Sequence, residues 1–284
     1  MDRIDTHLHL IAPEQFAYEW TASIPALAGH EFSLADYHHA AAGLGITESI
    51  FMEVDVAKKD LVSEATWFCK LAENPANRLC GVIAACRPEH SDFEQQLEAL
   101  AHPKLIGFRR VLHTQADEFS TSSLFRQNIM RIGKAGLTFD LCMLPRQLEH
   151  GAALIDACPD TRFILDHCGV PDIASGELGF WRDQLREISK RPNLACKISG
   201  IIAYAAGEIT SETLRPVVEH TINCFGWDRV IWGSDWPVCN LTRDLKSWGR
   251  LLDEILAGCS PDELARFYQH NAHEVYRISP ISAA

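Results

Sequence analysis

Basic runs and long apolar segments are both missing from this sequence. No block of five or six Lys and Arg residues occurs, and the formal net charge of the 284 residues is −12. A nucleic-acid partner is therefore not expected, because phosphate backbones are bound by clustered cations. No uninterrupted apolar stretch of roughly 18 residues occurs, and no basic segment leads into a short apolar one after Met1. We expect a cytoplasmic protein without a membrane partner.

Paired cysteines and a glycine-rich phosphate loop are absent as well. The ten cysteines include no C-x-x-C pair, and several lie in apolar runs. We therefore expect reduced cysteines that pack as small hydrophobic residues, rather than disulfides or a thiolate metal site. No G-x-G-x-x-G turn follows the first apolar run, which removes the fingerprint of a dinucleotide-binding fold.

A short apolar run, a polar loop and an amphipathic segment recur along the whole chain. Capping-box spacing marks helix starts at Ser91-Asp92-Phe93-Glu94 and at Ser260-Pro261-Asp262-Glu263. Strands that alternate with helices pair in parallel, and eight such units close a barrel, although an open doubly wound sheet is the alternative. We predict one (β/α)8 TIM barrel domain, in the α/β class, over residues 1–284. Its strands are expected at Arg3–Leu10, Thr47–Val54, Leu79–Cys86, Leu105–Leu112, Leu137–Leu144, Arg162–Gly169, Leu194–Ile201 and Arg229–Pro237.

The first predicted strand ends in Asp5-Thr6-His7-Leu8-His9. Side chains two apart on a strand point to the same face, so His7 and His9 are expected to project together into the barrel mouth. There they could share one metal ion or one substrate group. An H-x-H pair alone is equally compatible with one histidine in the core and one at a polar rim.

Two later strands end in residues of the same kind. His167 closes the run that begins at Phe163, and Asp235 closes the run that begins at Val230. Residues at the C-terminal ends of barrel strands face the active site, whereas strand middles are filled by branched apolar side chains. We expect His167 to be a third imidazole, and Asp235 to be a metal ligand or the base that takes a proton from water. A helix N-cap or a loop salt bridge is the alternative for Asp235.

Charged side chains end three further strands, at Glu53, Arg109-Arg110 and Lys197. Because strand faces alternate, only one of the two arginines can point inward, and we choose Arg109. Its guanidinium suits a carboxylate or sugar hydroxyls, while Lys197 could stabilise an oxyanion or hold a hydroxyl. A structural ion pair across the mouth is an equally good interpretation of Glu53 and Lys197.

Four residues are candidates of second rank: Asp140, His113, Ser199 and Trp20. Asp140 lies inside a strand, where a buried carboxylate needs a partner, and we expect an inward arginine. Trp20 lies in the long loop after the first strand, where it could form an apolar wall of the site or belong to the ordinary core.

Together these motifs resemble the amidohydrolase superfamily, of the amidohydrolase 2 type. Within it they resemble the lactonase branch of L-fuconolactonases, L-rhamnonolactonases and 2-pyrone-4,6-dicarboxylate lactonases. The resemblance covers nearly the whole chain, and the strong joint signal is D-x-H-x-H together with Gly-Ser-Asp-Trp-Pro. The matching segments are Asp5 to His9, Gly107 to His113, Phe139 to Leu141, Leu165 to Gly169, Cys196 to Gly200 and Trp232 to Cys239.

The resemblance implies roles for individual residues. Metal-site and general-base positions are matched by His7, His9, His167 and Asp235, with Glu53 as a further candidate ligand where relatives often carry glutamine. Substrate-proximal positions are matched by Arg109, His113 and Lys197, and Trp20 is added to these as a candidate wall. One divalent ion is implied rather than two, because Arg109 stands where two-metal members place a bridging lysine or glutamate. Zinc is the ion expected. Some lactonases of this branch work without a metal, so catalysis without one stays open.

Lactone hydrolysis is the function that the sequence favours. We expect a carboxylic ester hydrolase of carbohydrate metabolism that opens a sugar-derived or carboxylated lactone, with Asp235 and His167 as catalytic residues and Lys197 assisting. A metal-dependent decarboxylase of the same superfamily is the first alternative. A barrel that binds a sugar acid or a metal without turnover is the second. A homodimer is compatible with the sequence, which does not fix the oligomeric state.

Overall fold

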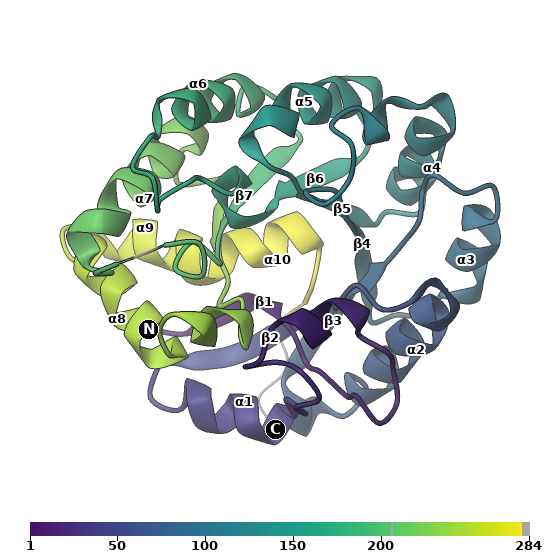
Figure 1. Ribbon diagram of the computed structural model, residues 1–284, viewed down its shortest axis with the longest axis horizontal. Helices are drawn as coiled ribbons and strands as arrows, with labels where there is room; N and C mark the ends of the chain where they lie inside the picture. Colours follow the sequence, from purple (N-terminus) through teal and green to yellow (C-terminus); the bar gives the residue numbers. More distant parts are fainter. Residues whose placement is uncertain (206, 280–284) are drawn as a thin grey trace.

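Eight parallel strands form one sheet in the computed structural model, which describes residues 1–205 and 207–279. Each strand pairs with its neighbours in sequence order, so the strands follow one another around a ring (Figure 1). The strands are β1 (Arg3–Leu8), β2 (Ile46–Met52), β3 (Leu79–Ala85), β4 (Leu105–Val111), β5 (Thr138–Cys142), β6 (Arg162–Leu165), β7 (Leu194–Ile198) and β8 (Val230–Trp232).

The ring closes between the first and the last strand, just beyond their C-terminal ends. Leu8 and Trp236 form a parallel bridge. The His9 amide donates to the Trp236 carbonyl at 2.8 Å, and the Asp235 amide donates to the His7 carbonyl at 2.9 Å. The predicted (β/α)8 barrel is thus confirmed, and its closure brings three candidate site residues to one place.

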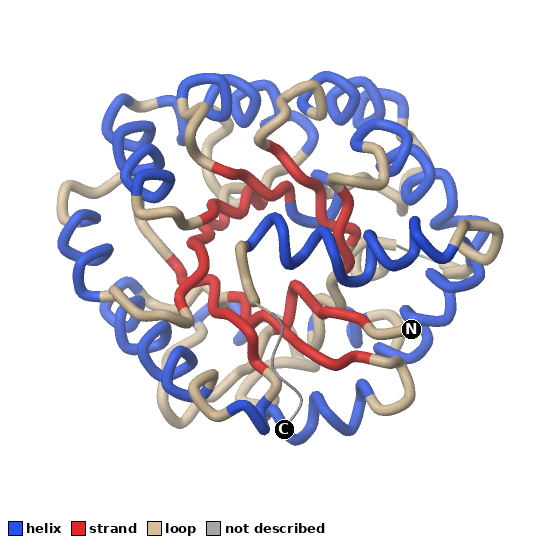
Figure 2. The backbone as a smooth tube through the Cα atoms, turned by 180° about the vertical axis from the view of Figure 1, so that it is seen from behind, coloured by secondary structure: helices blue, strands red, loops and turns tan. Residues whose placement is uncertain are grey.

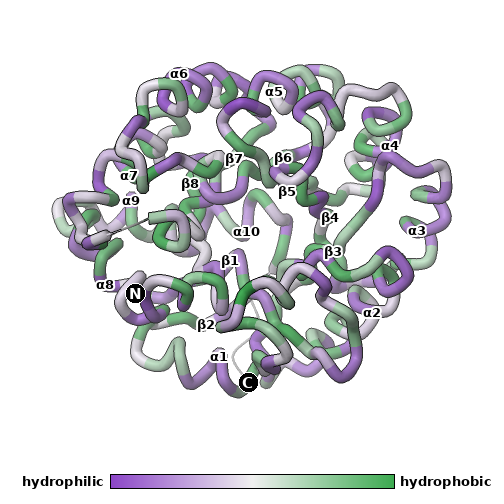
Figure 3. The backbone as a smooth tube through the Cα atoms, in the orientation of Figure 1, coloured by the Kyte–Doolittle hydropathy of each residue, from purple (hydrophilic) through white to green (hydrophobic). Residues whose placement is uncertain are grey.

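Helices surround the ring of strands, as the crossovers between parallel strands require (Figure 1). The strands are mostly hydrophobic, while the outer helices alternate hydrophobic and hydrophilic stretches (Figure 3). The helices are α1 (Leu34–Ala41), α2 (Leu61–Leu71), α3 (Phe93–Ala99), α4 (Ser123–Lys134), α5 (Leu148–Ala157), α6 (Gly179–Ile188), α7 (Ser211–Phe225), α8 (Leu245–Ile255), α9 (Pro261–Ala265) and α10 (Asn271–Tyr276). Within the described ranges, no helix combines the length and the apolar character that a membrane span needs.

The segment from α9 to α10 closes one end of the barrel. It crosses the opening of the ring when the molecule is seen from behind (Figure 2). Ala272 and Tyr276 of α10 join a buried cluster with isoleucines from the strands, among them Ile4 and Ile231. These isoleucines precede the polar residues on the same strands, so α10 covers the end opposite to the one that carries the histidines.

All eight predicted strands exist, but most end earlier than predicted at their C-terminal ends. The largest difference is at β8, which ends at Trp232 instead of Pro237. The next is at β6, which ends at Leu165, because Asp166–Gly169 turns into a 3-10 segment with left-handed backbone at His167 (φ 54°). The strand periodicity cannot continue through such a turn. The polar residues that follow the strands therefore leave the sheet and gather at its mouth.

One of the two expected capping boxes is correct. Ser260 accepts from the Glu263 amide and Glu263 accepts from the Ser260 amide, as predicted. The box at Ser91 is wrong: α3 begins at Phe93, so Asp92 takes the cap position and Ser91 lies outside the helix. The ten cysteines are all free in the described chain, and eight of them are buried, as expected of reduced core residues.

Candidate active site

A cavity of about 300 Å³ lies at the mouth of the barrel. Its polar wall includes five residues predicted from the sequence: His9, Arg109, His113, His167 and Asp235. Its apolar wall is made by Trp20, Ile24, Val54, Val111, Ala203, Val238 and Leu241. The cavity thus joins strand-end residues that are far apart in the sequence to an apolar enclosure, which is typical of a small-molecule site.

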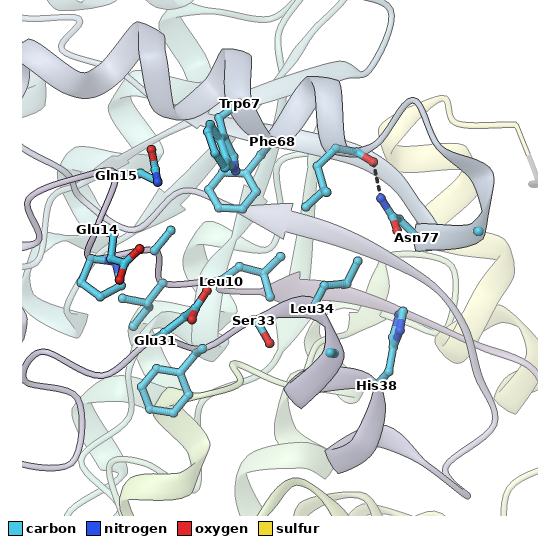
Figure 4. A pocket seen from close by; sticks show the side chains of 17 residues that line it. Leu10, Glu14, Gln15, Glu31, Ser33, Leu34, His38, Trp67, Phe68 and Asn77 are labelled. Carbon is cyan, nitrogen blue, oxygen red and sulfur yellow. Dashed lines mark hydrogen bonds between the residues drawn. The ribbon is translucent and has the colours of Figure 1, made fainter.

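A second hollow, of about 470 Å³, lies outside the barrel along α1 and α2 (Figure 4). Leu10, Phe68 and Leu34 line it, and Glu14 and Glu31 lie at one end. None of the predicted site residues takes part in it, so its greater volume does not make it the candidate active site.

His7 and His9 are held side by side at the end of β1. Their ring centroids lie 4.9 Å apart. Nδ1 of His9 lies 3.0 Å from the Met52 carbonyl, so this nitrogen carries the proton and leaves the Nε2 lone pair free. Burial, helped by the charge of Lys197, lowers the pKa of His7 well below its usual value, so His7 is neutral at physiological pH.

His167 reaches the same place from the turn after β6. Its ring centroid is 4.6 Å from that of His7, and its Nδ1 lies 2.9 Å from the Ser199 hydroxyl. Burial lowers the pKa of His167. The structure therefore brings three imidazoles together, those of His7, His9 and His167, with Ser199 as the hydrogen-bond partner of His167.

Asp235 faces these imidazoles from the segment after β8. Its Oδ1 lies 3.4 Å from Nε2 of His9 and 3.6 Å from Nε2 of His7. Its Oδ2 is buried and has no hydrogen-bond partner among the described residues. One carboxylate oxygen is thus shared by two imidazoles, and the other is left available to a water or a ligand.

Arg109 is the inward arginine of β4, as expected. Its Nε donates to Oε1 of Glu53 at 2.5 Å, and its Nη2 donates to the Glu53 carbonyl at 2.8 Å. Its Nη1 lies 3.2 Å from Nε2 of His7. Arg110 points the other way, to Glu89 at 2.9 Å. The ion-pair interpretation of Glu53 is therefore the one that this geometry supports.

Lys197 lies beneath the cavity rather than in its wall. It is fully buried, and its Nζ lies 2.7 Å from Oδ2 of Asp140, 3.0 Å from Oδ1 of Asp166 and 3.3 Å from Nδ1 of His7. Burial disfavours its charge, but Asp140 and Asp166 outweigh this and raise its pKa. Its ammonium group is thus held by a hydrogen bond to Asp140 and an ion pair with Asp166, and the expected direct contact with a substrate is not supplied by this geometry.

The expected partner of Asp140 was wrong. Burial raises the pKa of Asp140 to about 7, and its Oδ2 accepts from Lys197 and from the Tyr276 hydroxyl, at 3.0 Å for the latter. An inward arginine was expected because a buried carboxylate needs a partner, and Arg109 does lie beside Asp140 in the sheet. The Arg109 guanidinium instead turns toward Glu53, so the lysine of β7 takes its place.

His113 and Trp20 lie where the sequence predicted, in the wall of the cavity. Burial lowers the pKa of His113 to about 4, and its Nδ1 contacts the Cys142 thiol at 3.0 Å. The Trp20 indole is fixed by donating to the Val54 carbonyl at 2.8 Å.

Four residues of the site were not among the candidates. Asp55, Thr114 and Tyr204 line the cavity from loops, where no period reveals orientation. Asp166 lies under it, fully buried, between Lys197 and His7. Burial opposes its ionisation, but Lys197 and His7 outweigh burial and hold its pKa well below the usual value. Its place next to His167 was the signal that could have identified it.

Two overlapping sets of side chains could hold a metal ion. His7, His9 and Asp235 form one set, and His7, Asp166 and His167 form the other. In each set, the ligand atoms lie within 4.8 Å of one another. Glu53 belongs to neither, because its carboxylate accepts from Arg109 and from the Asp55 amide.

Comparison with known proteins finds the same family along the whole chain. The amidohydrolase family profile matches residues 4–278. L-fucono-1,5-lactonase of Burkholderia ambifaria is 27% identical over 282 residues, which cover 97% of this chain and 96% of that protein. The 4-sulfomuconolactone hydrolase of Rhizobium radiobacter is 25% identical and covers 82% of this chain and 75% of that protein.

Solved structures share the fold. The crystal structure of an amidohydrolase from Burkholderia multivorans with bound zinc superposes with a TM-score of 0.89 at 24% identity. The alignment covers 98% of this chain and 100% of that one. At this identity the likeness supports the barrel architecture, and the chemistry has to be argued from the site itself.

Proposed function

Because the chain belongs to the amidohydrolase family, we propose that it hydrolyses a small neutral lactone with Asp235 as the base that activates water. The observation that carries this proposal is the meeting of His7, His9, His167 and Asp235 at one cavity. The lactone-hydrolysing relatives support the choice of reaction.

The donor set fits one divalent metal ion. A ring nitrogen of His7, Nε2 of His9 and an oxygen of Asp235 offer the two imidazoles and one carboxylate of many catalytic zinc sites. The Met52 carbonyl orients His9 so that its Nε2 lone pair is available. The family neighbour with bound zinc favours zinc as the ion.

The buried charges around the mouth support the same conclusion. Two cations, Arg109 and Lys197, lie among four buried carboxyl groups, those of Glu53, Asp140, Asp166 and Asp235. With all four ionised, the cluster carries an excess of two negative charges. Uncompensated charge is costly in a low-dielectric interior, and one divalent cation would neutralise this excess. When bound, such an ion polarises a carbonyl oxygen and lowers the pKa of a water molecule.

The chain's own residues supply the remaining steps. The free oxygen of Asp235 accepts a proton from water as the water oxygen bonds to the lactone carbonyl carbon. Arg109, in the cavity wall, stabilises the negative charge that develops on the carbonyl oxygen. The bond to the ring oxygen then breaks, and Asp235 returns its proton to the leaving alkoxide. The carboxylic acid product ionises and releases one proton to solvent.

The lining of the cavity supports a neutral substrate over a carboxylated one. Among the described residues of the lining, Arg109 is the one Lys or Arg, and Glu53 already pairs with it, whereas Asp55 and Asp235 present carboxylates. Thr114 and Asp55 can hold hydroxyl groups of a sugar-derived lactone. The apolar wall suits an unsubstituted or methyl-bearing side of the ring.

A lactone panel tests this proposal. Neutral aldonolactones and carboxylated lactones are supplied to the protein in weak buffer with a pH indicator, with and without chelator, and carbon dioxide is measured from aromatic acids. Acid release from neutral lactones supports the proposal. Carbon dioxide release would favour the decarboxylase alternative, and tight ligand or metal binding without any turnover would favour the binding barrel.

A further inference from the structure

The last helix reaches the polar interior of the barrel through one side chain. Tyr276, at the end of α10, is 3% exposed and lies among the isoleucines that fill the closed end of the ring. Its hydroxyl donates to Oδ2 of Asp140 at 3.0 Å. A residue outside the eight strand-helix units thus makes a direct hydrogen bond to a charged group on β5.

Asp140 depends on this bond for its orientation. Its Oδ2 is held between the Tyr276 hydroxyl and the Lys197 ammonium, while its Oδ1 has no partner in the described chain. A fully buried carboxylate with two donors on one oxygen loses half of its hydrogen bonds when one donor is removed. Burial already favours the protonated form of Asp140, so its ability to hold Lys197 rests on both donors.

Lys197 connects Asp140 to the residues at the mouth of the barrel. Its ammonium group lies between Asp140 at 2.7 Å and Asp166 at 3.0 Å. Oδ1 of Asp166 in turn lies 3.4 Å from Nδ1 of His7. If Asp140 releases Lys197, the ammonium shifts its interaction to Asp166 and competes there with His7 for the same oxygen.

We propose that Tyr276 is a positioning residue: through Asp140 and Lys197 it holds Asp166 and His7 in the arrangement that the site requires. The hydroxyl contacts neither the cavity nor any candidate metal ligand, so its effect on turnover is indirect. The inference rests on the proposed function only for its kinetic readout.

The test compares Tyr276→Phe with a matched control, Tyr268→Phe. Tyr268 is a buried tyrosine of the same terminal segment, and its hydroxyl bonds to Asp253 at 2.9 Å, away from Asp140. Both variants lose one tyrosine hydroxyl bonded to a carboxylate, but Asp253 is half exposed and Asp140 is fully buried, so a smaller loss of thermal stability is expected for Tyr268→Phe. Loss of a hydrogen bond to a charged group corresponds to about a tenfold change in the equilibrium constant for the arrangement that it stabilises. We expect kcat of Tyr276→Phe to fall about tenfold with KM unchanged, and Tyr268→Phe to retain both.

A second readout does not need turnover. Calorimetric titration of the metal-free proteins with zinc is expected to give weaker binding for Tyr276→Phe than for Tyr268→Phe, because His7 is less well oriented. If no lactone is opened by the wild type, the proposed function fails while this titration still decides the role of Tyr276.

Asp140→Asn extends the test as a double-mutant cycle. Once the charge of Asp140 is gone, adding Tyr276→Phe should change zinc affinity and kcat little further, because both changes act on the same path. Equal behaviour of the Tyr276 and Tyr268 variants in both readouts would overturn the inference. Additive effects of Asp140→Asn and Tyr276→Phe would overturn it as well, and so would a Tyr276→Phe protein that fails to fold.

Discussion

Replacing Asp235 with asparagine tests the proposed base while leaving its surroundings in place. Asp235 has a left-handed backbone conformation, with φ of 58°. Asparagine is one of the few residues that adopts this conformation readily, so the turn after β8 is kept. The Asp235 amide bond to the His7 carbonyl that closes the barrel does not involve the side chain. The substitution therefore removes one negative charge, one proton acceptor and the carboxylate of the proposed metal-ligand set, while the backbone of the turn is kept.

The size of the effect follows from the role. A positioned general base contributes about 10²- to 10⁴-fold to rate, which corresponds to about 3–5 kcal/mol of barrier. We expect kcat to fall by this factor. The unfolding free energy should change little, because the site already carries more negative than positive charge.

Asp55→Asn is the matched control. Asp55 is also an aspartate of the cavity wall with a left-handed backbone, φ 45°, but its carboxylate pairs with Arg87 at 2.9 Å rather than with imidazoles. Loss of its contact with substrate hydroxyls should raise KM and change kcat much less. The assay is acid release from the best neutral lactone, with thermal melting by circular dichroism on each protein. An Asp235→Asn enzyme with kcat near the wild-type value would refute the reasoning. A decrease in kcat no larger than that of Asp55→Asn would refute it as well.

The other predictions concern the support of the site. Glu53→Gln leaves the Arg109 guanidinium buried without its carboxylate, which should cost about 3–5 kcal/mol of unfolding free energy; urea denaturation that finds under about 1 kcal/mol would contradict this. Gly200→Ala should abolish activity, because a Cβ there would collide with Nδ1 of His167 and lie 2.7 Å from Oδ2 of Asp235, at a φ of 62°. Zinc at about 100 times its Kd should stabilise the metal-free protein by about 2.7 kcal/mol, seen as a higher melting temperature. An unchanged melting temperature would argue against the metal site.

The sequence was sufficient to predict the strands and the residues that end them. Apolar runs of strand length and the alternation of faces identified His7 and His9 and limited the inward arginine to one of Arg109 and Arg110, since these depend only on local periodicity. The alternation did not decide between the two arginines. For Trp20 the sequence left open a wall of the site or the ordinary core, and the structure places it in the cavity wall. The exact end of β6 was not predictable, because the left-handed backbone at His167 is imposed by packing at the mouth rather than by glycine at that position.

The hydrogen-bond partners of side chains in the barrel interior were harder to predict than the positions of those side chains on the strands. Asp140 was correctly expected to need a partner, but both Arg109 on the neighbouring β4 and Lys197 on β7 point into the barrel, and periodicity does not distinguish between them. The second partner, Tyr276, comes from a helix 136 positions later in the chain. Only the three-dimensional path of that helix across the closed end shows that its last tyrosine reaches β5.

The placement of the two cations bears on how many metal ions the mouth can hold. The second set of candidate ligands, His7, Asp166 and His167, shares its carboxylate with Lys197 at 3.0 Å and with Arg109 at 3.7 Å. A second divalent ion at this set would lie close to two buried positive charges, and in a low-dielectric interior that repulsion is large. Both cations lie against the one carboxylate of this set, so Asp166 offers less net negative charge to an ion than Asp235 does. The geometry therefore supports one ion, held by His7, His9 and Asp235, with the ammonium and guanidinium groups occupying the place of a second.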